Sequence, residues 1–287
     1  MAIIFAFCCI FCSAMNDFVF KLFARKPRSR GLFVFMIGVA WAAASSFLPD
    51  LRGASWNTTI LWGIISGLFS VIGNLLLIEA MGKQSAGLCS TIYRLNLALV
   101  VPGAWILFKE QNSLLQCIGI AAAFAAVLFF LPGSKNPNSD TSPRDAKLGL
   151  ILVIIAAILR AGMGLAYKYG FNLGASANGV NLVNAFCWIA GGPVYYFLRE
   201  RNLPELGAFS KKLTGYGILS GIFVFGIVFF MAHSVRLGNA SIVLPIMQMS
   251  FVVTFILSAV FLKEKLTLYK FIALSCGAAA LLCLSIK

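Results

Sequence analysis

The sequence consists of ten apolar runs of 18 or more residues, separated by short polar breaks. A helix needs about 20 apolar residues to cross a bilayer, so each run is long enough to span a membrane. Hydrophobic types make up 60% of the 287 residues and charged types only 11%, whereas a soluble domain carries roughly 25% charged residues. This composition excludes both a water-soluble globule and a disordered chain. We therefore predict an all-α membrane protein with ten transmembrane helices, at residues 2–23, 31–48, 58–81, 85–108, 114–131, 148–169, 179–198, 213–235, 239–262 and 268–286.

A polar stretch at residues 132–147, rich in Pro, Asn, Ser and Asp, separates five spans from five. The segments on either side, residues 1–131 and 148–287, are related in sequence. At an offset of 154, residues 63–69 align with 217–223, and Lys109-Glu110 aligns with Lys263-Glu264. At an offset of 147, residues 14–21 align with 161–168. These alignments indicate an internal duplication, with one five-helix repeat on each side of a polar linker.

The odd number of spans in each repeat has a geometric consequence. The second repeat enters the membrane from the opposite side, so the two repeats form an inverted pair about an axis in the membrane plane. Many secondary transporters have this architecture, and they hold substrate near the midplane between the repeats.

Short Lys-Glu segments precede the last span of each half, at residues 108–113 and 262–267, and small residues begin the fourth and ninth spans. With these features the chain resembles the drug/metabolite transporter superfamily, and more specifically the EamA family. The second segment matches better, because Glu110 in the first is followed by Gln-Asn-Ser. The resemblance implies a secondary transporter of a small molecule, with export as the expected direction.

The basic residues are distributed unequally between the two sides of the predicted membrane protein. The loops that follow odd-numbered spans hold 16 Lys and Arg residues, and the other loops with the C-terminus hold 5. The positive-inside rule then places the odd loops in the cytoplasm and both termini outside. The resemblance implies the reverse, because characterised members often have both termini inside; we follow the charge count.

Arg94 lies close to the predicted midplane of the fourth span, where an ionisable side chain is costly and indicates function. Gln248 is its counterpart in the second repeat. We predict that Arg94 binds an anionic group of the substrate in a site that also includes Tyr93, Asn96 and Gln248. The alternative is a structural ion pair of Arg94 with Asp17 or Glu79.

Other polar residues within spans extend the predicted site. Arg160, near the middle of the sixth span, is a further binding candidate or a partner for Asp17. Asp17 is the candidate proton carrier, because a carboxyl group in an apolar cavity can alternate between its neutral and charged forms; a structural salt bridge is the alternative. Asn184 and Trp188 share one helix face with Asn181, which fits either substrate binding or helix–helix hydrogen bonding.

No enzyme motif is present, and Asp17 and His233 would be an unpersuasive catalytic pair for an intramembrane enzyme. The net charge of +14 arises mostly between the spans, so we expect no nucleic-acid partner. We also expect no cofactor and no metal site. The predicted function is secondary transport of a small polar metabolite, by a monomer or homodimer in contact with lipids of the bacterial inner (cell) membrane. A non-transporting scaffold or receptor is the remaining alternative.

Overall fold

The computed structural model describes residues 1–46, 55–108, 113–133, 142–203, 210–237, 246–262 and 267–285. Within these ranges the chain is helical and contains no strand. The first half forms α1 (Ala2–Ala24), α2 (Arg30–Ser45), α3 (Trp56–Lys83), α4 (Ala86–Arg94), α5 (Leu97–Phe108) and α6 (Leu114–Gly133). The second half forms α7 (Pro143–Asn172), α8 (Ala177–Tyr195), the π-helical turn η1 (Tyr196–Glu200), α9 (Lys211–Leu237), α11 (Ser250–Leu262) and α12 (Leu268–Ser285).

Serine residues cap the starts of several helices. The hydroxyls of Ser29, Ser85, Ser142 and Ser176 each accept a hydrogen bond from the backbone N–H three residues later, so one otherwise unpaired donor of each first turn is satisfied. Because Ser142 caps α7, this helix begins within the predicted linker. Residues 134–141 of the linker, and most of the two Lys-Glu segments, lie outside the described residues.

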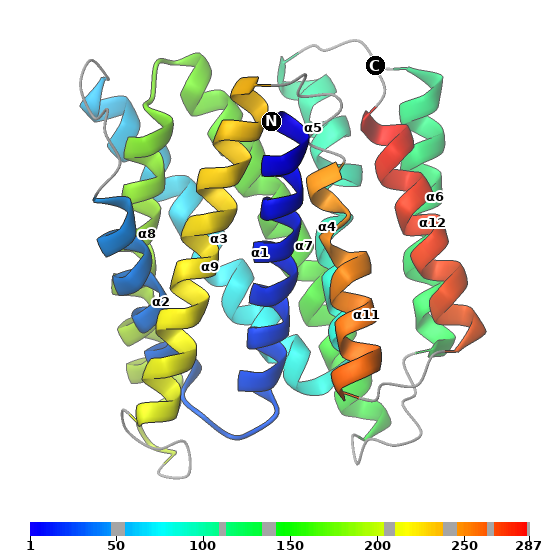
Figure 1. Cartoon of the computed structure of the whole chain (residues 1–287), viewed down its shortest axis with the longest axis horizontal. Helices are drawn as coiled ribbons and strands as arrows, with labels where there is room; N and C mark the ends of the chain where they lie inside the picture. The colour runs from blue at the N-terminus through cyan, green and yellow to red at the C-terminus, as the bar shows by residue number, and fades with distance from the viewer. Residues whose placement is uncertain are drawn as a thin grey trace.

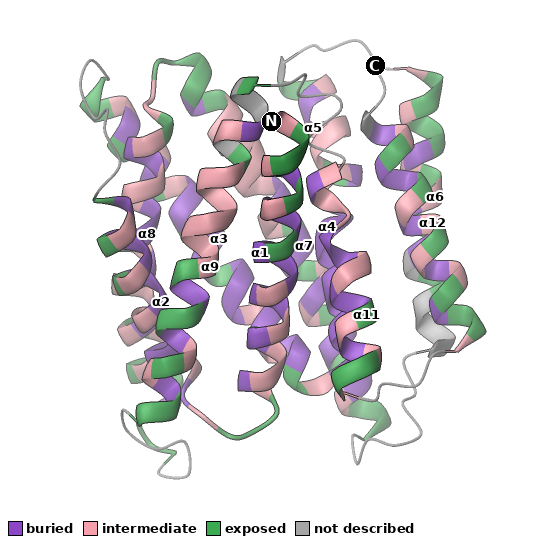
Figure 2. Cartoon of the chain, in the orientation of Figure 1, coloured by how far each residue is buried: buried purple, intermediate pink, exposed green. Residues whose placement is uncertain are grey.

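The helices lie side by side and cross the same slab, and α1 starts and α12 ends toward its upper edge (Figure 1). Among the described helices, five are long and apolar enough to span a membrane by themselves. Large apolar side chains such as Phe7 and Ile64 are exposed, as expected for side chains in contact with lipid, and exposed positions recur along most of the helices (Figure 2). The prediction of an all-α membrane protein with ten spans in two inverted repeats is confirmed.

The two edges of the bundle are named here by the charge of their loops. The first, third, fifth, seventh and ninth spans end at the lower edge in Figure 1, which we call the basic face because the odd loops carry most Lys and Arg residues. The upper edge is the opposite face.

The helix pairings obey an approximate twofold symmetry. The helices α1, α2, α3 and α6 correspond to α7, α8, α9 and α12. The contact between α1 and α9 is accordingly matched by one between α7 and α3, and that between α2 and α9 by one between α8 and α3. The pairs α2–α8, α4–α11 and α6–α12 pack across the axis. Inverted repeats require this pattern, because the axis exchanges the two halves.

Glycines at equivalent positions make equivalent close contacts. A methyl group on Gly67 of α3 would lie 2.5 Å from the sulfur of Cys187 on α8, and one on Gly221 of α9 would lie 2.5 Å from Cβ of Ala40 on α2. Gly67 and Gly221 are 154 residues apart, and Ala40 and Cys187 are 147 apart. Small residues allow the helix backbones to approach closely in a membrane, so both duplicated contacts depend on glycine.

This close packing predicts opposite effects for two glycine substitutions on α9. Gly221→Ala places a methyl group 2.9 Å from the backbone oxygen of Ile37, which cannot move aside alone. We expect it to lower the free energy of unfolding by about 1–3 kcal/mol. The matched control is Gly215→Ala, where no atom lies within 4 Å, and the better helix propensity of alanine should stabilise the protein by up to about 1 kcal/mol. Thermal unfolding in detergent would measure both; equal shifts would contradict the packing.

Candidate functional site

The sequence predicted one continuous helix for the fourth span. In the structure this helix is interrupted directly after Arg94. The backbone N–H of Leu95 bonds to the carbonyls of both Thr91 and Ile92 at 3.1 Å, Leu95 and Asn96 then form a turn, and α5 starts at Leu97. The ninth span breaks at the equivalent position, where the N–H of Met249 bonds to the carbonyl of Ile246 at 3.0 Å. Both breaks lie at the same offset of 154 that relates the two repeats.

The first break places irregular backbone inside the bundle. Leu95 and Asn96 are both buried, as membrane proteins require of non-helical backbone at this depth. Pro102 is not the shared cause, because residue 256 in the second repeat is isoleucine. Arg94 and Gln248 immediately precede the two breaks, and transporters built from inverted repeats commonly bind substrate at such interruptions.

A polar cavity of about 90 Å³ lies beside the first break. It is enclosed by side chains from α1, α2, α3, α4, α7, α8 and α9. The lining residues are Asn16, Asp17, Trp41, Ser70, Asn74, Tyr93, Arg94, Arg160, Met163, Tyr167, Asn181, Trp188, Val224, Ile227, Val228 and Met231.

Half of the lining residues form pairs that the pseudo-twofold axis exchanges. At an offset of 147, Asn16 corresponds to Met163 and Trp41 to Trp188. At an offset of 154, Ser70 corresponds to Val224 and Asn74 to Val228. The cavity therefore lies on the axis between the repeats, but its polar groups differ between the two sides.

The charged centre of the cavity is an ion pair between α4 and α1. Nη2 of Arg94 lies 3.4 Å from Oδ2 of Asp17, and both side chains are more than nine-tenths buried. The hydroxyl of Ser90 donates a hydrogen bond of 2.6 Å to the same carboxylate oxygen. Glu79, the other acid considered as a partner for Arg94, lies 4.0 Å from Arg30 instead. The structure thus contains the Arg94–Asp17 pair that the sequence left as an alternative.

A second guanidinium group, from α7, reaches the same cavity. The guanidinium carbon of Arg160 lies 5.1 Å from the ring centre of Tyr93, which is a cation–π arrangement. No acidic side chain within the described residues lies within salt-bridge distance of Arg160. Asp17 is the only acid among the lining residues, so two guanidinium groups face one carboxylate.

Four of the eight predicted site residues either do not line the cavity or form hydrogen bonds with neighbouring helices. Asn96 is buried and Gln248 half-buried, and neither lines the cavity. Asn184 is fully buried, accepts a hydrogen bond of 2.9 Å from Ser66 on α3 and donates to Tyr167. Trp188 lines the cavity and donates to Ser70 at 3.0 Å.

The cavity lining also differs from the prediction at residues outside this set of eight. His233 does not line the cavity; its Nδ1 lies 2.9 Å from the carbonyl oxygen of Phe229, one turn earlier. Sequence reasoning missed Trp41, Asn74 and Tyr167 as lining residues. The offset of 147 between Trp41 and Trp188 was the available signal, since both tryptophans occupy one position of the repeat.

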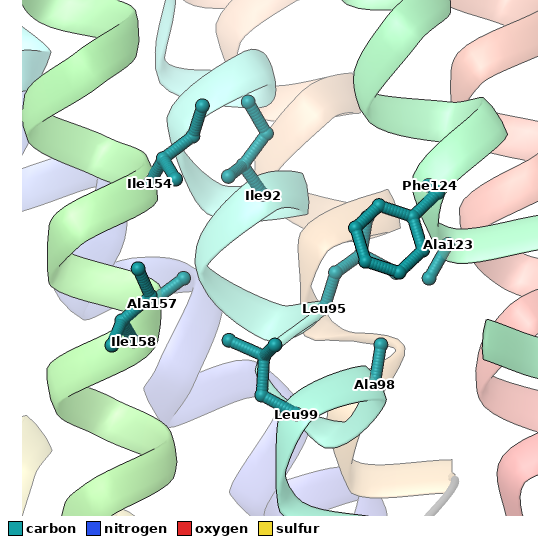
Figure 3. Close-up of a pocket in the computed structure, with 9 residues that line it drawn as sticks. All are labelled: Ile92, Leu95, Ala98, Leu99, Ala123, Phe124, Ile154, Ala157 and Ile158. Atoms are coloured by element: carbon teal, nitrogen blue, oxygen red, sulfur yellow. The ribbon is translucent and has the colours of Figure 1, made fainter. Parts of the chain in front are cut away.

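A larger cavity, of about 260 Å³, lies between the α4–α5 break, α6 and α7 (Figure 3). Its wall consists of apolar side chains, among them Ile92, Leu95, Phe124 and Ile158. A polar metabolite would lose its hydration there without gaining hydrogen bonds. The smaller polar cavity is therefore the candidate site for a polar substrate.

Hydrogen bonds connect α1, α3 and α7 at the basic face. The ammonium group of Lys21 on α1 donates to the carbonyl oxygens of Met81, at 2.7 Å, and Gln84, at 2.5 Å, at the end of α3. The amide of Gln84 donates to the carbonyl of Ala146 at 2.6 Å. Lys83 pairs with Asp145 at 2.7 Å, and this hydrogen bond lowers the pKa of Asp145 below its ordinary value.

An aromatic layer lies beside these hydrogen bonds, near the same face. The rings of Phe23 and Phe33 stack with centroids 3.8 Å apart, and Phe20 packs edge-on against Phe33. All three side chains are essentially inaccessible. The corresponding helices of the second repeat are less closely packed: α1 packs on α3, but α7 and α9 make no comparable contact within the described residues.

The cavity extends from the middle of the bundle toward the opposite face. Its lining residues Met163 and Tyr167 lie in the half of α7 farther from the basic face, and Asn181 lies near the start of α8, at the opposite face. The structure is closed at the basic face.

Comparisons with known proteins relate the second half of the chain to a family. A family model described as the EamA-like transporter family matches residues 147–286. A crystal structure of another protein matches 97% of this chain and 96% of its own, with a TM-score of 0.63 and 15% sequence identity, a likeness that concerns the fold alone. No curated protein sequence matches the chain. The matched segment covers nearly all of the second repeat, so this half of the chain is similar to the EamA-like transporter family, and the apolar helices are those of an integral membrane protein.

Proposed function

We propose that this protein is a secondary transporter that carries a small polar metabolite with a carboxylate or phosphate group across the membrane by alternating access. The observation that carries the proposal is the charge of the polar cavity, where Arg94 and Arg160 face the single acid Asp17. This excess positive charge favours an anion or a zwitterion. Guanidinium groups also bind carboxylate and phosphate through two parallel hydrogen bonds.

In this proposal the lining residues have separate roles. Arg94 and Arg160 bind the anionic group, while Tyr93 and Trp188 form the aromatic wall around the rest of the substrate. Asp17 gives up its bond to Arg94 when the substrate anion arrives and then takes a proton on its carboxylate, which couples transport to protons. Asn96 and Gln248 lie next to the two helix breaks and join the site when the breaks move, and Asn184 orients Tyr167.

The charge of the basic face also indicates the orientation of the transporter and the direction of transport. With the basic face in the cytoplasm, the cavity extends toward the outside of the cell. The described conformation is then the outward-facing one of the transport cycle. In a bacterial inner membrane this arrangement suits release of an exported solute. We expect a reporter that is active only in the cytoplasm to stay inactive when fused to the C-terminus, and one that requires the periplasm to be active. The reverse pattern would overturn the orientation.

Counterflow in liposomes tests the function. Purified protein would be reconstituted into vesicles loaded with one unlabelled solute, with the labelled solute outside, for a panel of organic acids, amino acids, sugar phosphates and amines. We expect transient accumulation of carboxylated or phosphorylated solutes, and none of the amines. Accumulation of amines alone would contradict an anionic substrate. The absence of counterflow for every solute would favour a scaffold or receptor, and a chemically altered solute would indicate an enzyme.

A further inference from the structure

Two tryptophans meet at the pseudo-twofold axis of the polar cavity. Trp41 of α2 and Trp188 of α8 occupy the same position of the two repeats, and both line the cavity. Their rings meet edge to face, with centroids 5.9 Å apart and planes at 90°. The pair is therefore symmetric in residue type and position.

The hydrogen bonds of this pair are not symmetric. The indole N–H of Trp188 donates to the hydroxyl of Ser70 at 3.0 Å. The indole N–H of Trp41 is buried and has no acceptor among the described residues. The residue that corresponds to Ser70 in the second repeat is Val224, which also lines the cavity and carries no acceptor. The missing bond follows from this one difference between the repeats.

An unpaired buried donor is unfavourable. Leaving one without a partner costs about 1–3 kcal/mol, and a buried tryptophan N–H usually finds one. The other unpaired polar atom among the described lining residues is Nε of Arg94, which is also a donor. Both groups need an acceptor, and a ligand with an oxyanion would bring several.

We propose that Trp41 is a substrate-binding residue, whose indole N–H donates a hydrogen bond to a carboxylate or phosphate oxygen of the substrate held beside Arg94. This inference rests on the proposed transport function and deepens it. It makes the valine at position 224 a determinant of specificity, because an acceptor there would occupy the N–H that the substrate requires. Solutes without an acceptor would leave the N–H unpaired and bind poorly.

The test observes the N–H directly. The indole ¹H–¹⁵N resonance of Trp41, assigned by its loss in Trp41→Phe, would be followed in purified protein during titration with propionate, methyl phosphate and propylammonium. We expect a downfield shift with at least one of the two oxyanions and none with propylammonium. Propionate and methyl phosphate distinguish a carboxylate site from a phosphate site. No shift with either oxyanion, or an equal shift with propylammonium, would overturn the proposal.

Two substitutions at one position supply the matched comparison. Val224→Thr keeps the shape of valine and offers a hydroxyl to Trp41, whereas Val224→Ala removes bulk without adding an acceptor. In Val224→Thr the Trp41 resonance should be shifted before any probe is added, and affinity for the effective oxyanion should fall about tenfold relative to Val224→Ala. Equal affinities in the two variants would contradict the assignment.

The outcome is independent of whether the protein transports. If the resonance responds to oxyanions but no solute shows counterflow, the proposed function fails and the binding of an oxyanion by Trp41 stands. If an anionic solute is transported with the same KM by Trp41→Phe as by the parent, the role of Trp41 fails and the proposed function stands.

Discussion

Replacing Asp17 by asparagine should destabilise the protein far more than replacing its partner Arg94 by glutamine. The two side chains form a buried ion pair, and removal of one partner leaves the other charge buried. Arginine cannot lose its proton in a protein, whereas a carboxylate left alone can take one up and become neutral. We expect Asp17→Asn to lower the free energy of unfolding by about 3–5 kcal/mol and Arg94→Gln to lower it by about 1–3 kcal/mol.

The double variant separates stability from function. Asp17→Asn combined with Arg94→Gln removes both charges, so its stability should exceed that of Asp17→Asn alone. Counterflow of an anionic solute should nonetheless fall at least about 30-fold in Arg94→Gln and in the double variant. Arg94→Lys keeps the charge but not the two parallel hydrogen bonds, so it should insert normally and transport poorly.

Glu79→Gln is the control for this set, because it breaks the longer and more exposed Arg30–Glu79 pair. It should cost about 1 kcal/mol or less. Thermal unfolding in detergent and counterflow in liposomes measure the two properties. An Asp17→Asn protein as stable as the parent, or parent-rate transport of an anion by Arg94→Gln, would contradict the assigned roles.

Replacing Lys21 by methionine should open the basic face. Lys21 holds the end of α3 through two carbonyl oxygens, and a hydrogen bond from a charged donor contributes about 1.5–3 kcal/mol. Each 1.4 kcal/mol is a factor of about ten in population. We therefore expect the population that is open at the basic face to rise at least about tenfold in Lys21→Met.

A native cysteine reports the opening. Cys89 lies in α4, one turn from its start at the basic face, and is fully buried, whereas Cys117 on α6 is exposed. The rate of maleimide labelling at Cys89, measured by mass spectrometry, should rise about tenfold in Lys21→Met, with the rate at Cys117 unchanged.

Two lysine variants make this measurement specific. Lys83→Met removes the half-exposed salt bridge to Asp145 on the same face, and it should leave the labelling rate near that of the parent. Lys168 corresponds to Lys21 in the second repeat, so Lys168→Met should not raise labelling at Cys89. If all three variants raise it equally, the effect is a general loosening and the role of Lys21 is wrong.

Several features of the fold could be predicted from the sequence because lipid imposes them directly. A bilayer requires apolar runs of a fixed length, so the ten spans and their all-helical class follow from composition and run length. The offsets of 154 and 147 revealed the inverted repeat. The structure then places the glycine contacts of Gly67 and Gly221, and the breaks at Leu95 and Met249, at these offsets.

The break in the fourth span illustrates what the sequence did not reveal. Neither Leu95 nor Asn96 is a residue that interrupts helices by itself, and the apolar pattern continues across them. The helix ends there because its neighbours bury the irregular backbone. Only packed helices can compensate for such an interruption in a membrane.

The sequence by itself determined how many times the chain crosses the membrane and that its halves are inverted copies, and it singled out Arg94 as an ionisable residue within a span. Only the tertiary structure decided that Arg94 contacts Asp17, that Trp41 lacks the acceptor its counterpart has, and that the basic face is closed. The physical reason is that apolar helices in lipid gain little from hydrophobic burial against each other. Which faces meet therefore depends on close packing and on a few hydrogen bonds between residues far apart in the chain, and a pattern of hydrophobicity along the sequence does not record those contacts.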